Sequence, residues 1–341
     1  MKVGMYYNNS DVRVVEQKIP TIGNNDILIK VMACGICGSD LMEWYRIKRA
    51  PLVLGHELAG EIVEIGKDVV QFQVGDKVFT THHVPCNECY YCLTGHHTAC
   101  QVFQTENNFE PGGFAEFLRV GGRSIKTGTF KLPKEMSYET ATFIEPLATV
   151  VRALRTIDLQ LGDNLMIFGC GLAGILFVKL ARALGSGKII VSDVSEYRME
   201  IAKKSGAHLS ISAKEDVPSF VRQNNNERLA DKVIICTGAL TAAKSALNCV
   251  DRGGNVLFFA VPKPGEKIPI DFNPYWRNDV SIKTCYGAAP LDNKQALDLL
   301  RTGVINVEDM ITHRFSLNDI GEAFKRASKV DGTLKVIVEP N

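Results

Sequence analysis

Four cysteines lie close together in the sequence with the spacing C-x2-C-x2-C-x7-C. Thiolates bind Zn²⁺ tetrahedrally at about 2.3 Å, and four of them fill every coordination position, as in structural rather than catalytic sites. The metal would hold a lobe, residues 84–102, that has little apolar core of its own. An iron–sulfur cluster also uses clustered cysteines, but nothing else in the chain indicates electron transfer. The predicted ligands are Cys86, Cys89, Cys92 and Cys100.

A second set of metal-ligating residue types is spread over three segments. Cys37 lies in C-G-I-C-G-S-D, His56 and Glu57 lie in G-H-E-x-x-G, and Glu145 precedes a proline. Cysteine, histidine and carboxylate from separate segments suit a catalytic zinc, which keeps one position open for substrate or water. A redox C-x-x-C made of Cys34 and Cys37 is the alternative. That motif normally opens a helix beside a βαβ unit, whereas here it follows a predicted barrel strand, so zinc is favoured.

Four histidines lie near the cysteine lobe. Each is a metal-ligating residue type, but a single histidine in a loop is more often solvated than bound to a metal. We therefore predict that all four are solvated loop residues: His82, His83, His96 and His97.

A glycine-rich turn with the pattern G-x-G-x-x-G joins a predicted strand to a predicted helix. In a dinucleotide site, Gly169 makes the tight turn, Gly171 lets the backbone approach the pyrophosphate, and Gly174 allows close helix–sheet packing. Asp193 ends the next predicted strand, nineteen residues after Gly174, and its carboxylate can accept hydrogen bonds from the ribose hydroxyls. A 2′-phosphate would be repelled there, so NAD is favoured over NADP. The alternative is a glycine-rich turn that binds no nucleotide.

The elements that must position these residues fall into three regions. Residues 1 to about 145 show short alternating strands between Gly-Asp and Gly-Lys turns, which is typical of a small β-barrel with inserted loops. From about 148 to 284, buried strands alternate with helices, which predicts a parallel, doubly wound sheet. The tail from about 285 returns to mixed character. The predicted strands include 26–33, 61–65, 164–168, 188–192, 232–236, 255–259, 280–283 and 334–338, and the predicted helices include 169–185, 195–206 and 291–302.

Composition limits the classes of protein to which the chain can belong. Its 341 residues are 45% hydrophobic and 23% charged, which is ordinary for a globular chain of about two domains. Lys+Arg and Asp+Glu number 39 and 38, so no strong field favours nucleic acid or an anionic membrane. The longest uncharged apolar run, 165–178, is too short to span a bilayer, and the first residues contain no apolar signal core. We therefore expect a cytoplasmic protein without nucleic-acid or membrane partners.

In combination, these motifs resemble those of the zinc-dependent medium-chain dehydrogenases, most closely their sorbitol dehydrogenase-like polyol branch. The resemblance rests on both cysteine motifs, G-H-E-x-x-G, the Glu-Pro pair and the glycine-rich turn with its acid, and it covers essentially the whole chain. It implies an α/β fold in which a GroES-like β-barrel catalytic domain (1–147 and 285–341) encloses a Rossmann doubly wound parallel-sheet domain (148–284) in the sequence. It also implies zinc-assisted, NAD(P)-dependent interconversion of alcohols and carbonyl compounds.

The resemblance also implies roles for residues of the predicted catalytic site. Cys37 and His56 correspond to catalytic zinc ligands. Glu57 corresponds to a direct ligand or to one that exchanges with water, and Glu145 takes the position of a further ligand, so which glutamate binds is open. Asp40 resembles the acid that orients the zinc-bound histidine.

Proton transfer and cofactor binding are implied in the same way. Ser39 resembles the hydroxyl that bridges the substrate oxygen and the cofactor ribose, so Ser39, Asp40 and Glu57 form the expected catalytic set. Cys34 is not a ligand in the family pattern. The family implies two Zn²⁺ ions per chain, one catalytic and one structural, together with NAD. The expected cofactor-binding residues are Gly169, Gly171, Leu172, Ala173, Gly174, Asp193, Arg198 and Thr237.

The chain departs from the family pattern at two places. Many relatives have a histidine five residues after the catalytic cysteine, whereas this chain has Met42, which carries no proton; Glu43 or solvent would serve instead. Sorbitol dehydrogenases usually place an Arg-Tyr pair near the last interdomain strand, and here Tyr286 matches the tyrosine while the arginine is missing. Nearby residues either line the substrate site or serve packing: Trp44, Tyr45, Arg46, Tyr275, Trp276 and Arg277.

The main hypothesis is an NAD-dependent dehydrogenase that converts a polyol or secondary alcohol to the ketone. A dehydrogenase of an amino alcohol or cyclitol, of the threonine or inositol type, is the alternative. A non-catalytic zinc- and nucleotide-binding protein is disfavoured, because such a protein has no need of an open zinc position. The resemblance further implies a homotetramer or homodimer built by continuing the Rossmann sheets edge to edge at 255–261 or 280–286, unless these segments are interior strands.

Overall fold

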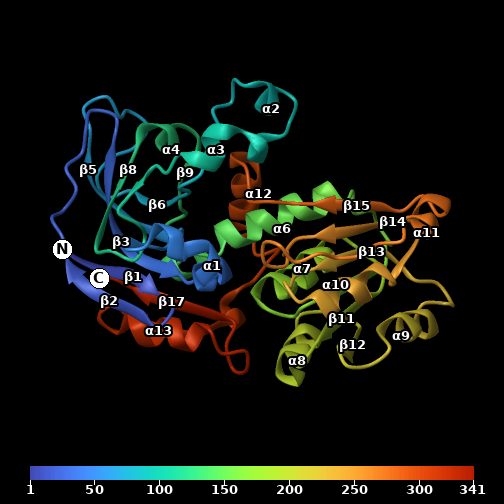
Figure 1. Ribbon diagram of the computed structural model, residues 1–341. Helices are drawn as coiled ribbons and strands as arrows, with labels where there is room; N and C mark the ends of the chain where they lie inside the picture. The colour runs from blue at the N-terminus through green and yellow to red at the C-terminus, as the bar shows by residue number, and fades with distance from the viewer. The chain divides into compact units, whose positions relative to one another are not determined.

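The computed structural model describes residues 1–341, which divide into two compact units. Unit 1 comprises Met1–Ala148 and Ala288–Asn341, and unit 2 comprises Thr149–Gly287. Both ends of the chain therefore belong to the same unit, as the blue and red ribbons of Figure 1 show. No helix has the length and apolar character needed to cross a membrane.

Unit 1 is built on two sheets of largely antiparallel strands. Its main sheet has the order β16-β17-β3-β5-β6-β9, with β8 beside β3, and a second sheet has the order β2-β1-β4. Side chains of β3 alternate between buried and half-buried over 29–33, as expected for a strand with one face in a barrel core. The strands are β1 (Lys2–Asn8), β2 (Asp11–Glu16), β3 (Ile27–Gly35), β4 (Leu52–Val53), β5 (Glu57–Ile65), β6 (Lys77–Thr80), β7 (Phe109–Glu110), β8 (Phe117–Val120), β9 (Thr129–Lys131), β16 (Ile311–Ser316) and β17 (Lys335–Glu339).

The register of the barrel strands brings the ends of three strands together. In the antiparallel ladder of β3 and β5, Gly35 lies opposite Glu57, and in the ladder of β17 and β3, Gly35 lies opposite Ile337. The end of β3, the start of β5 and the start of β17 are therefore neighbours. Cys37 follows the first of these ends and His56 precedes the second, so strand pairing alone brings these two residues close.

The helices of unit 1 are mostly short and cover or connect the strands. The C-terminal helix α13 packs its Phe324 ring against those of Phe114 and Tyr6, at centroid distances of 5.7 and 6.2 Å. All three side chains are buried in the barrel core, so the C-terminal segment is part of the same core as β1. The helices are α1 (Glu43–Arg46), α2 (Tyr90–Leu93), α3 (Gln101–Thr105), α4 (Gly122–Thr127), α5 (Tyr138–Ala141), α12 (Pro290–Arg301) and α13 (Ile320–Ala327).

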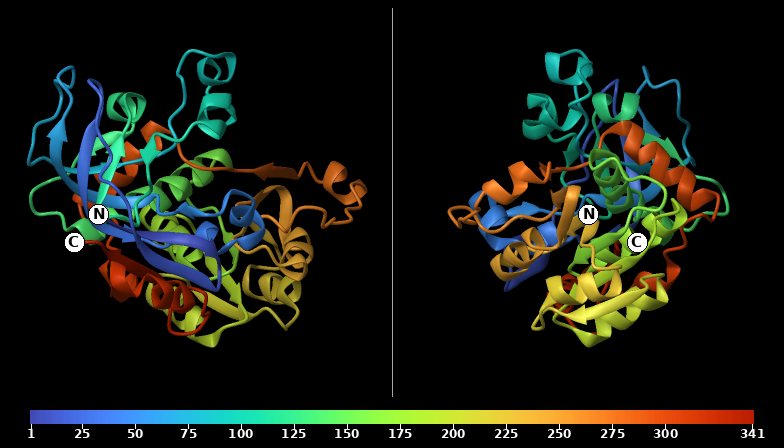
Figure 2. Two further views of the ribbon diagram at one scale, coloured as in Figure 1. Left: turned by 60° about the vertical axis from the view of Figure 1, so that its left-hand side comes forward. Right: turned by 90° about the vertical axis from the view of Figure 1, so that its right-hand side faces the viewer.

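The lobe that carries the four-cysteine motif contains α2 and α3 and has almost no apolar core. Its buried cluster consists of Cys92, Cys100 and Phe103, against which Cys86 and Cys89 pack. In both views of Figure 2, this teal segment extends away from the barrel strands of the same unit. So small a cluster cannot offset the entropy of ordering the lobe, and a further cross-link is needed to hold it.

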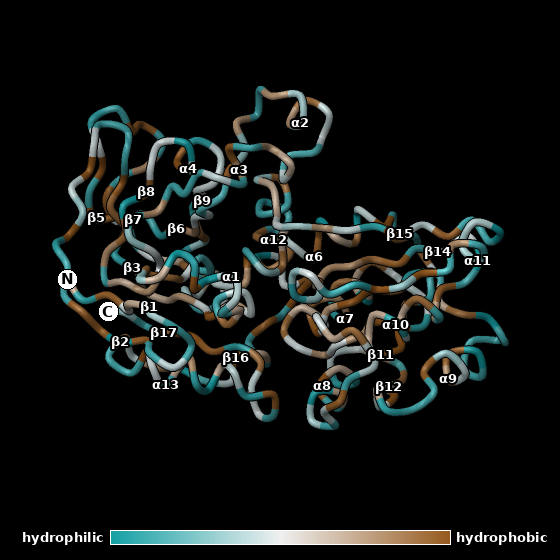
Figure 3. Tube along the Cα trace, viewed as in Figure 1, coloured by the Kyte–Doolittle hydropathy of each residue, from teal (hydrophilic) through white to brown (hydrophobic).

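Unit 2 contains a six-stranded parallel sheet with the order β12-β11-β10-β13-β14-β15. In chain order this is 3-2-1-4-5-6, the order of dinucleotide-binding sheets. Strands β10 and β11 are buried along their whole length, as expected where helices cover both faces, and Figure 3 colours the central strands brown. The elements are β10 (Leu165–Phe168), α7 (Leu172–Ala183), β11 (Ile189–Asp193), α8 (Glu196–Lys204), β12 (Leu209–Ser212), α9 (Val217–Asn224), β13 (Ala230–Ile235), α10 (Leu240–Leu247), β14 (Val250–Phe258), α11 (Asn273–Arg277) and β15 (Ser281–Thr284), preceded by α6 (Ile144–Thr156), which continues from unit 1.

The predicted α/β fold with a β-barrel unit and a doubly wound sheet is confirmed. In the doubly wound sheet, β12 is the strand that no predicted range covers. Strand β12 has the sequence Leu-Ser-Ile-Ser and lies at the edge of the sheet, where three of its four side chains are only half-buried. A short edge strand of this kind has no continuous apolar run, which is the signal that reveals a buried parallel strand.

Candidate active site

Three potential metal ligands converge where the barrel strands end. Cys37 follows β3 and forms the N-cap of the short helix η1 (Gly38–Leu41), and His56 and Glu57 lie at the start of β5. One donor atom from each of these residues lies within 4.8 Å of the others. His56 and Glu57 are buried, so the donors face one another inside the protein rather than water. The structure therefore brings together residues from two separate sequence motifs.

Glu57 is held by a lysine that sequence reasoning did not single out. Lys335 Nζ and Glu57 Oε2 form an ion pair in which both side chains are excluded from solvent. A Cβ atom at Gly35 would lie 2.7 Å from Glu57 Oε2 and would collide with Lys335, so this close approach requires glycine. The signal in the sequence is weak, because Lys335 is one lysine in an apolar C-terminal strand.

The second carboxylate oxygen of Glu57 is the donor atom that most clearly fits a cation. Oε1 is buried and has no hydrogen-bond partner. A buried carboxylate oxygen without a partner costs several kcal/mol in free energy unless a cation or donor satisfies it. One thiol, one imidazole and a carboxylate with an unsatisfied oxygen are the donor types that Zn²⁺ prefers, and three protein ligands leave a position for substrate. The site therefore fits a catalytic zinc.

Asp40 contacts two of the candidate ligands, Cys37 and His56. Its side chain is fully buried, Oδ2 accepts a hydrogen bond from the backbone N–H of Cys37 at 3.1 Å, and Oδ1 lies 3.5 Å from His56 Nδ1. Burial lowers the pKa of His56, but Asp40 and Cys37 outweigh it and raise that pKa well above its usual range. A metal that binds here must displace the imidazole proton, which couples metal affinity to pH.

Glu145, in the first turn of α6, lies close enough to feel the same charges but is not one of the three converging donors. Burial raises its pKa to about 7, His56 and Lys335 oppose this rise, and Glu57 adds to it. Of the four predicted ligands, the structure thus brings Cys37, His56 and Glu57 together and places Glu145 at the margin.

Ser39 and Arg46 form a polar pair beside this cluster. Arg46 Nη2 donates to Ser39 Oγ at 2.9 Å, and its Nε donates to the backbone carbonyl of Ser39 at 3.0 Å. Its Nη2 also lies 3.3 Å from Asp40 Oδ1. The sequence alone does not distinguish whether Arg46 lines the substrate site or covers the barrel end. The structure connects Arg46 to Ser39 and Asp40, two of the predicted catalytic residues.

The prediction that all four histidines are solvated loop residues is wrong for His82, His83 and His97, which are half-buried. The His82 ring lies 5.2 Å from that of His56 and 3.7 Å from that of His83, measured between centroids, and its Nδ1 is excluded from solvent. Burial lowers the pKa of His82 well below its usual range, and His83 and His56 lower it further. The long-range approach of residue 82 to residue 56 follows from barrel closure and has no local sequence signal. His96, by contrast, is exposed.

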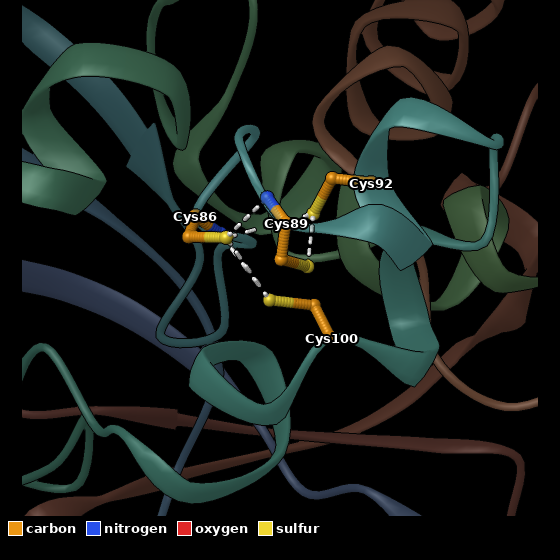
Figure 4. Close-up of side chains that lie close together, drawn as sticks. All are labelled: Cys86, Cys89, Cys92 and Cys100. Carbon is orange, nitrogen blue, oxygen red and sulfur yellow. Dashed lines mark hydrogen bonds between the residues drawn. The ribbon is translucent and has the colours of Figure 1, made fainter.

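The four-cysteine motif converges as its spacing predicts. Cys86 Sγ lies 3.6 Å from Cys100 Sγ and 3.9 Å from Cys92 Sγ, and Cys89 Sγ lies 3.5 Å from Cys92 Sγ. Figure 4 shows the four sulfur atoms pointing toward one another. All four cysteines are unpaired thiols, and no histidine or carboxylate joins them, so the set fits a closed, structural Zn²⁺ site.

The electrostatics of the lobe differ between its thiols. Burial would raise the pKa of Cys100, but backbone N–H groups of Cys86 and Phe103 donate to its sulfur and lower that pKa to about 6. Burial and hydrogen bonding to Cys89 raise the pKa of Cys92 to about 12.

In unit 2, the glycine-rich turn lies between β10 and α7. Gly169 has φ of +98°, and a Cβ at Gly174 would collide with the carbonyl oxygen of Gly169, so both positions require glycine. Gly171 is the N-cap of α7, and a Cβ there would meet only Arg198 Nη1, at 3.8 Å. The helix N-terminus, which begins at Leu172 and Ala173, is therefore open to an anion.

The remaining predicted cofactor residues surround this turn. Asp193 ends β11 and is buried; its Oδ2 accepts from the N–H of Cys170 at 2.6 Å and its Oδ1 from that of Ser195 at 2.9 Å. Arg198 Nε is buried without a partner. Thr237 follows β13, and its Cβ would lie 3.4 Å from a Cβ at Gly169. The backbone opening and the unsatisfied arginine fit a dinucleotide.

A β-barrel unit with an open three-donor metal site and a closed four-thiol site, joined to a dinucleotide-binding sheet, defines the class of zinc-dependent dehydrogenases. Comparison with known proteins agrees with this class. Residues 23–134 match the model of the alcohol dehydrogenase GroES-like domain, and residues 173–302 match that of the zinc-binding dehydrogenases.

Similarity extends over the whole chain. Sorbitol dehydrogenase from Bacillus subtilis is 32% identical, with 100% of this chain and 98% of that protein covered. L-threonine 3-dehydrogenase from Pseudoalteromonas atlantica is 30% identical, with 91% of each chain covered. Among solved structures, a zinc-binding dehydrogenase from Sinorhizobium meliloti bound to NADP superposes with a TM-score of 0.89, at 26% identity and 99% coverage of both chains. The chain belongs to the zinc-dependent medium-chain alcohol and polyol dehydrogenases.

Proposed function

We propose that this protein oxidises a polyol or secondary alcohol to the ketone with NAD as acceptor. The reaction takes a hydride from the carbinol carbon to the nicotinamide and releases the hydroxyl proton, so alcohol and NAD⁺ give ketone, NADH and H⁺. The observation that carries the proposal is the open set of Cys37, His56 and Glu57 donors with an unsatisfied buried oxygen. Its full-length similarity to a sorbitol dehydrogenase supports the polyol class.

Different residues of unit 1 are proposed to bind the metal, to orient its histidine ligand and to transfer the proton. Cys37, His56 and Glu57 would hold a Zn²⁺, and Glu145, whose pKa responds to the charges of His56 and Glu57, would be the alternative ligand. When bound, this metal polarises the alcohol oxygen and lowers the pKa of its hydroxyl. Asp40 keeps His56 oriented, and Ser39 takes the hydroxyl proton.

A second Zn²⁺ is proposed for the cysteine lobe, where it has a structural role. Cys86, Cys89, Cys92 and Cys100 would supply four thiolates and leave no position for substrate. The small buried cluster of the lobe supports this assignment, because without a cross-link the segment has too little apolar burial to stay ordered.

NAD is proposed over NADP because of the charge at the end of β11. Asp193 is buried beside the glycine-rich turn, and its carboxylate would repel a 2′-phosphate. Arg198, next to the turn, would instead favour NADP, and a related structure does bind NADP. In an Asp193→Ser variant we expect the ratio of kcat/KM for NAD to kcat/KM for NADP to fall by about tenfold or more. The reason is that the substitution removes the charge repulsion between the carboxylate and the 2′-phosphate.

A dehydrogenase of an amino alcohol or a cyclitol is the second candidate. It is favoured by the similarity to threonine dehydrogenases and by the absence of the arginine expected beside Tyr286 for polyols. NADH formation measured with polyols, secondary alcohols, cyclitols and threonine, with NAD and NADP, decides between the two. Activity with polyols that a chelator abolishes supports the first proposal, whereas activity only with threonine or a cyclitol supports the second. No turnover and no zinc beyond one ion per chain would reject both.

Self-association is proposed through the free edge of the unit 2 sheet. Strand β15 pairs only with β14, and the preceding segment exposes Trp276 and Phe272, which are 76% and 64% accessible. Pairing of two β15 edges would cover this edge, and a homodimer or homotetramer is the expected state. Light scattering of the purified protein tests this, and a monomer would reject it.

A further inference from the structure

The guanidinium of Arg46 is fixed more firmly than that of an ordinary surface arginine. Two of its nitrogens donate to Ser39, one to Oγ at 2.9 Å and one to the backbone carbonyl at 3.0 Å. The Tyr45 ring stacks below it at 4.7 Å, and its side chain is only 15% exposed. A fork of two hydrogen bonds to one residue, closed by an aromatic face, defines the position of the guanidinium and of the serine hydroxyl together.

This contact decides how Ser39 can use its hydroxyl. A serine oxygen has one proton to donate and two lone pairs to accept. Arg46 occupies one lone pair, and because a guanidinium accepts no hydrogen bond, it cannot receive the serine proton. The second lone pair is left for another hydroxyl, and the Ser39 proton must be donated to a third group. Arg46 thus determines which lone pair of Ser39 Oγ remains free to accept a hydrogen bond.

Met42 and Glu43, the two residues that follow η1, do not supply a titratable group for this purpose. Met42, at the end of η1, carries no proton and is exposed. Glu43 Oε1 accepts from the backbone N–H of Asn9 at 3.1 Å and so points toward the barrel strands β1 and β2. Arg46 is therefore the charged group that contacts the Ser39 side chain.

Resting on the proposed function, we infer that Arg46 is the positioning residue of proton transfer in this enzyme. It holds Ser39 so that the free lone pair of Oγ accepts the substrate hydroxyl proton. In that step the substrate O–H bond breaks, a new Ser39 Oγ–H bond forms, and the original Ser39 proton leaves to a cofactor hydroxyl or to water, so the serine ends unchanged. The positive charge of Arg46 favours early departure of the Ser39 proton, because it stabilises the partial negative charge that this departure leaves on Oγ.

A structural role is the competing explanation, because Arg46 also neutralises the fully buried Asp40, 3.3 Å away. The two roles predict that the effect of an Arg46 substitution depends on different residues, Ser39 in the first case and Asp40 in the second. If Arg46 acts through Ser39, its effect must disappear when the serine hydroxyl is absent. If it acts through Asp40, the effect persists without that hydroxyl.

The experiment is a double-mutant cycle of Arg46→Met and Ser39→Ala on the full-length zinc-loaded enzyme. A hydrogen bond to a charged group corresponds to about a tenfold to hundredfold effect, so kcat/KM should fall by about that factor in Arg46→Met. In the Ser39→Ala background, the same substitution should change kcat/KM by no more than about twofold. Arg46→Lys keeps the charge without the fork and should be intermediate, and it stands in if Arg46→Met does not fold. Lys48→Met, which removes an exposed charge from the same segment, is the control.

Two readouts do not depend on turnover. The dissociation constant of trifluoroethanol, an alcohol that is not oxidised, measured by calorimetry with oxidised cofactor present, should rise about tenfold in Arg46→Met and stay near the Ser39→Ala value in the double variant. The zinc content should stay at the wild-type value. Equal losses in both backgrounds, or loss of zinc from Arg46→Met, would place the role at Asp40 and overturn the inference. A wild type that oxidises no alcohol would instead refute the proposed function itself.

Discussion

The four-cysteine lobe takes all its donor atoms from fifteen consecutive residues, 86–100, whereas the Cys37–His56–Glu57 site takes them from the ends of two barrel strands. The lobe has a three-residue buried cluster, while β3 and β5 around the open site belong to the large core of unit 1. With the proposed zinc, the lobe would depend on its metal for order, whereas the open site depends on the order of the barrel. Chemistry is located where the fold would persist without the metal.

The lobe and the open site also differ in the number of charged side chains that they contain. The lobe contains thiols without a charged partner, and its sulfur atoms approach one another to 3.5–3.9 Å. The open site combines Asp40 and Glu57 with Lys335 and Arg46, all within hydrogen-bonding or ion-pair range of a partner. Buried charges require partners in any state of the site. The barrel therefore supplies cations of its own, which leaves room for a metal to be bound without being the only counter-charge.

Removal of the Cys37 thiol has the largest expected effect. In Cys37→Ser we expect kcat/KM for the best alcohol to fall about a thousandfold or more, because polarisation of the substrate oxygen by the metal contributes several kcal/mol to catalysis at the barrel site. The circular dichroism spectrum should be unchanged, since the site depends on the barrel and not the reverse. Cys34→Ala, a buried neighbour that faces the barrel core, is the matched control. Zinc-dependent activity in Cys37→Ser at the wild-type rate would refute this ligand.

Loss of the cation in the buried ion pair should have the next largest effect. Lys335→Met leaves the Glu57 carboxylate buried without its cation and should lower the free energy of unfolding by about 3–5 kcal/mol, measured by urea on chelator-treated protein. The double variant Glu57→Gln, Lys335→Met removes both charges and should recover most of this loss. If the single and double variants are equally unstable, packing of the lysine stem and not its charge is what the site requires.

Disruption of the lobe should have an effect that stays local. Cys92→Ser removes one thiolate, and we expect rapid proteolysis within residues 84–102 and loss of one zinc per chain, with the free energy of unfolding of the remainder changed by less than about 1 kcal/mol. The wild-type protein under the same protease is the reference. Loss of the barrel together with the lobe would show that the two regions are not independent.

The same contrast explains how much could be predicted from the sequence. The cysteine spacing predicts its site directly, because four local thiols can meet whatever the barrel does. The motif around His56 predicts the ligand types of the open site, and strand pairing then brings Cys37 to His56. The positions of Lys335 and His82 could not be predicted, because they depend on barrel closure over 278 and 26 residues of separation from Glu57 and His56. The contact of Arg46 with Ser39 spans only seven residues, but it depends on the irregular turn between η1 and α1, which has no periodic sequence signal.

The thiols of the lobe give the smallest and most local test. In the ordered lobe, backbone N–H groups of Cys86 and Phe103 lower the pKa of Cys100 to about 6, while burial and hydrogen bonding to Cys89 raise that of Cys92 to about 12. Because the lobe has too small a core to stay ordered without metal, chelation should return both thiols to the ordinary cysteine pKa. After chelation, iodoacetamide should therefore label Cys92 and Cys100 at rates within about twofold of each other at pH 7, as measured by mass spectrometry of peptides. Zinc-loaded protein is the control and should be labelled slowly at both residues. Labelling of Cys100 at least about tenfold faster than Cys92, with the difference lost as the pH falls through about 6, would show that the N–H groups still hold the Cys100 sulfur and that the lobe has order of its own.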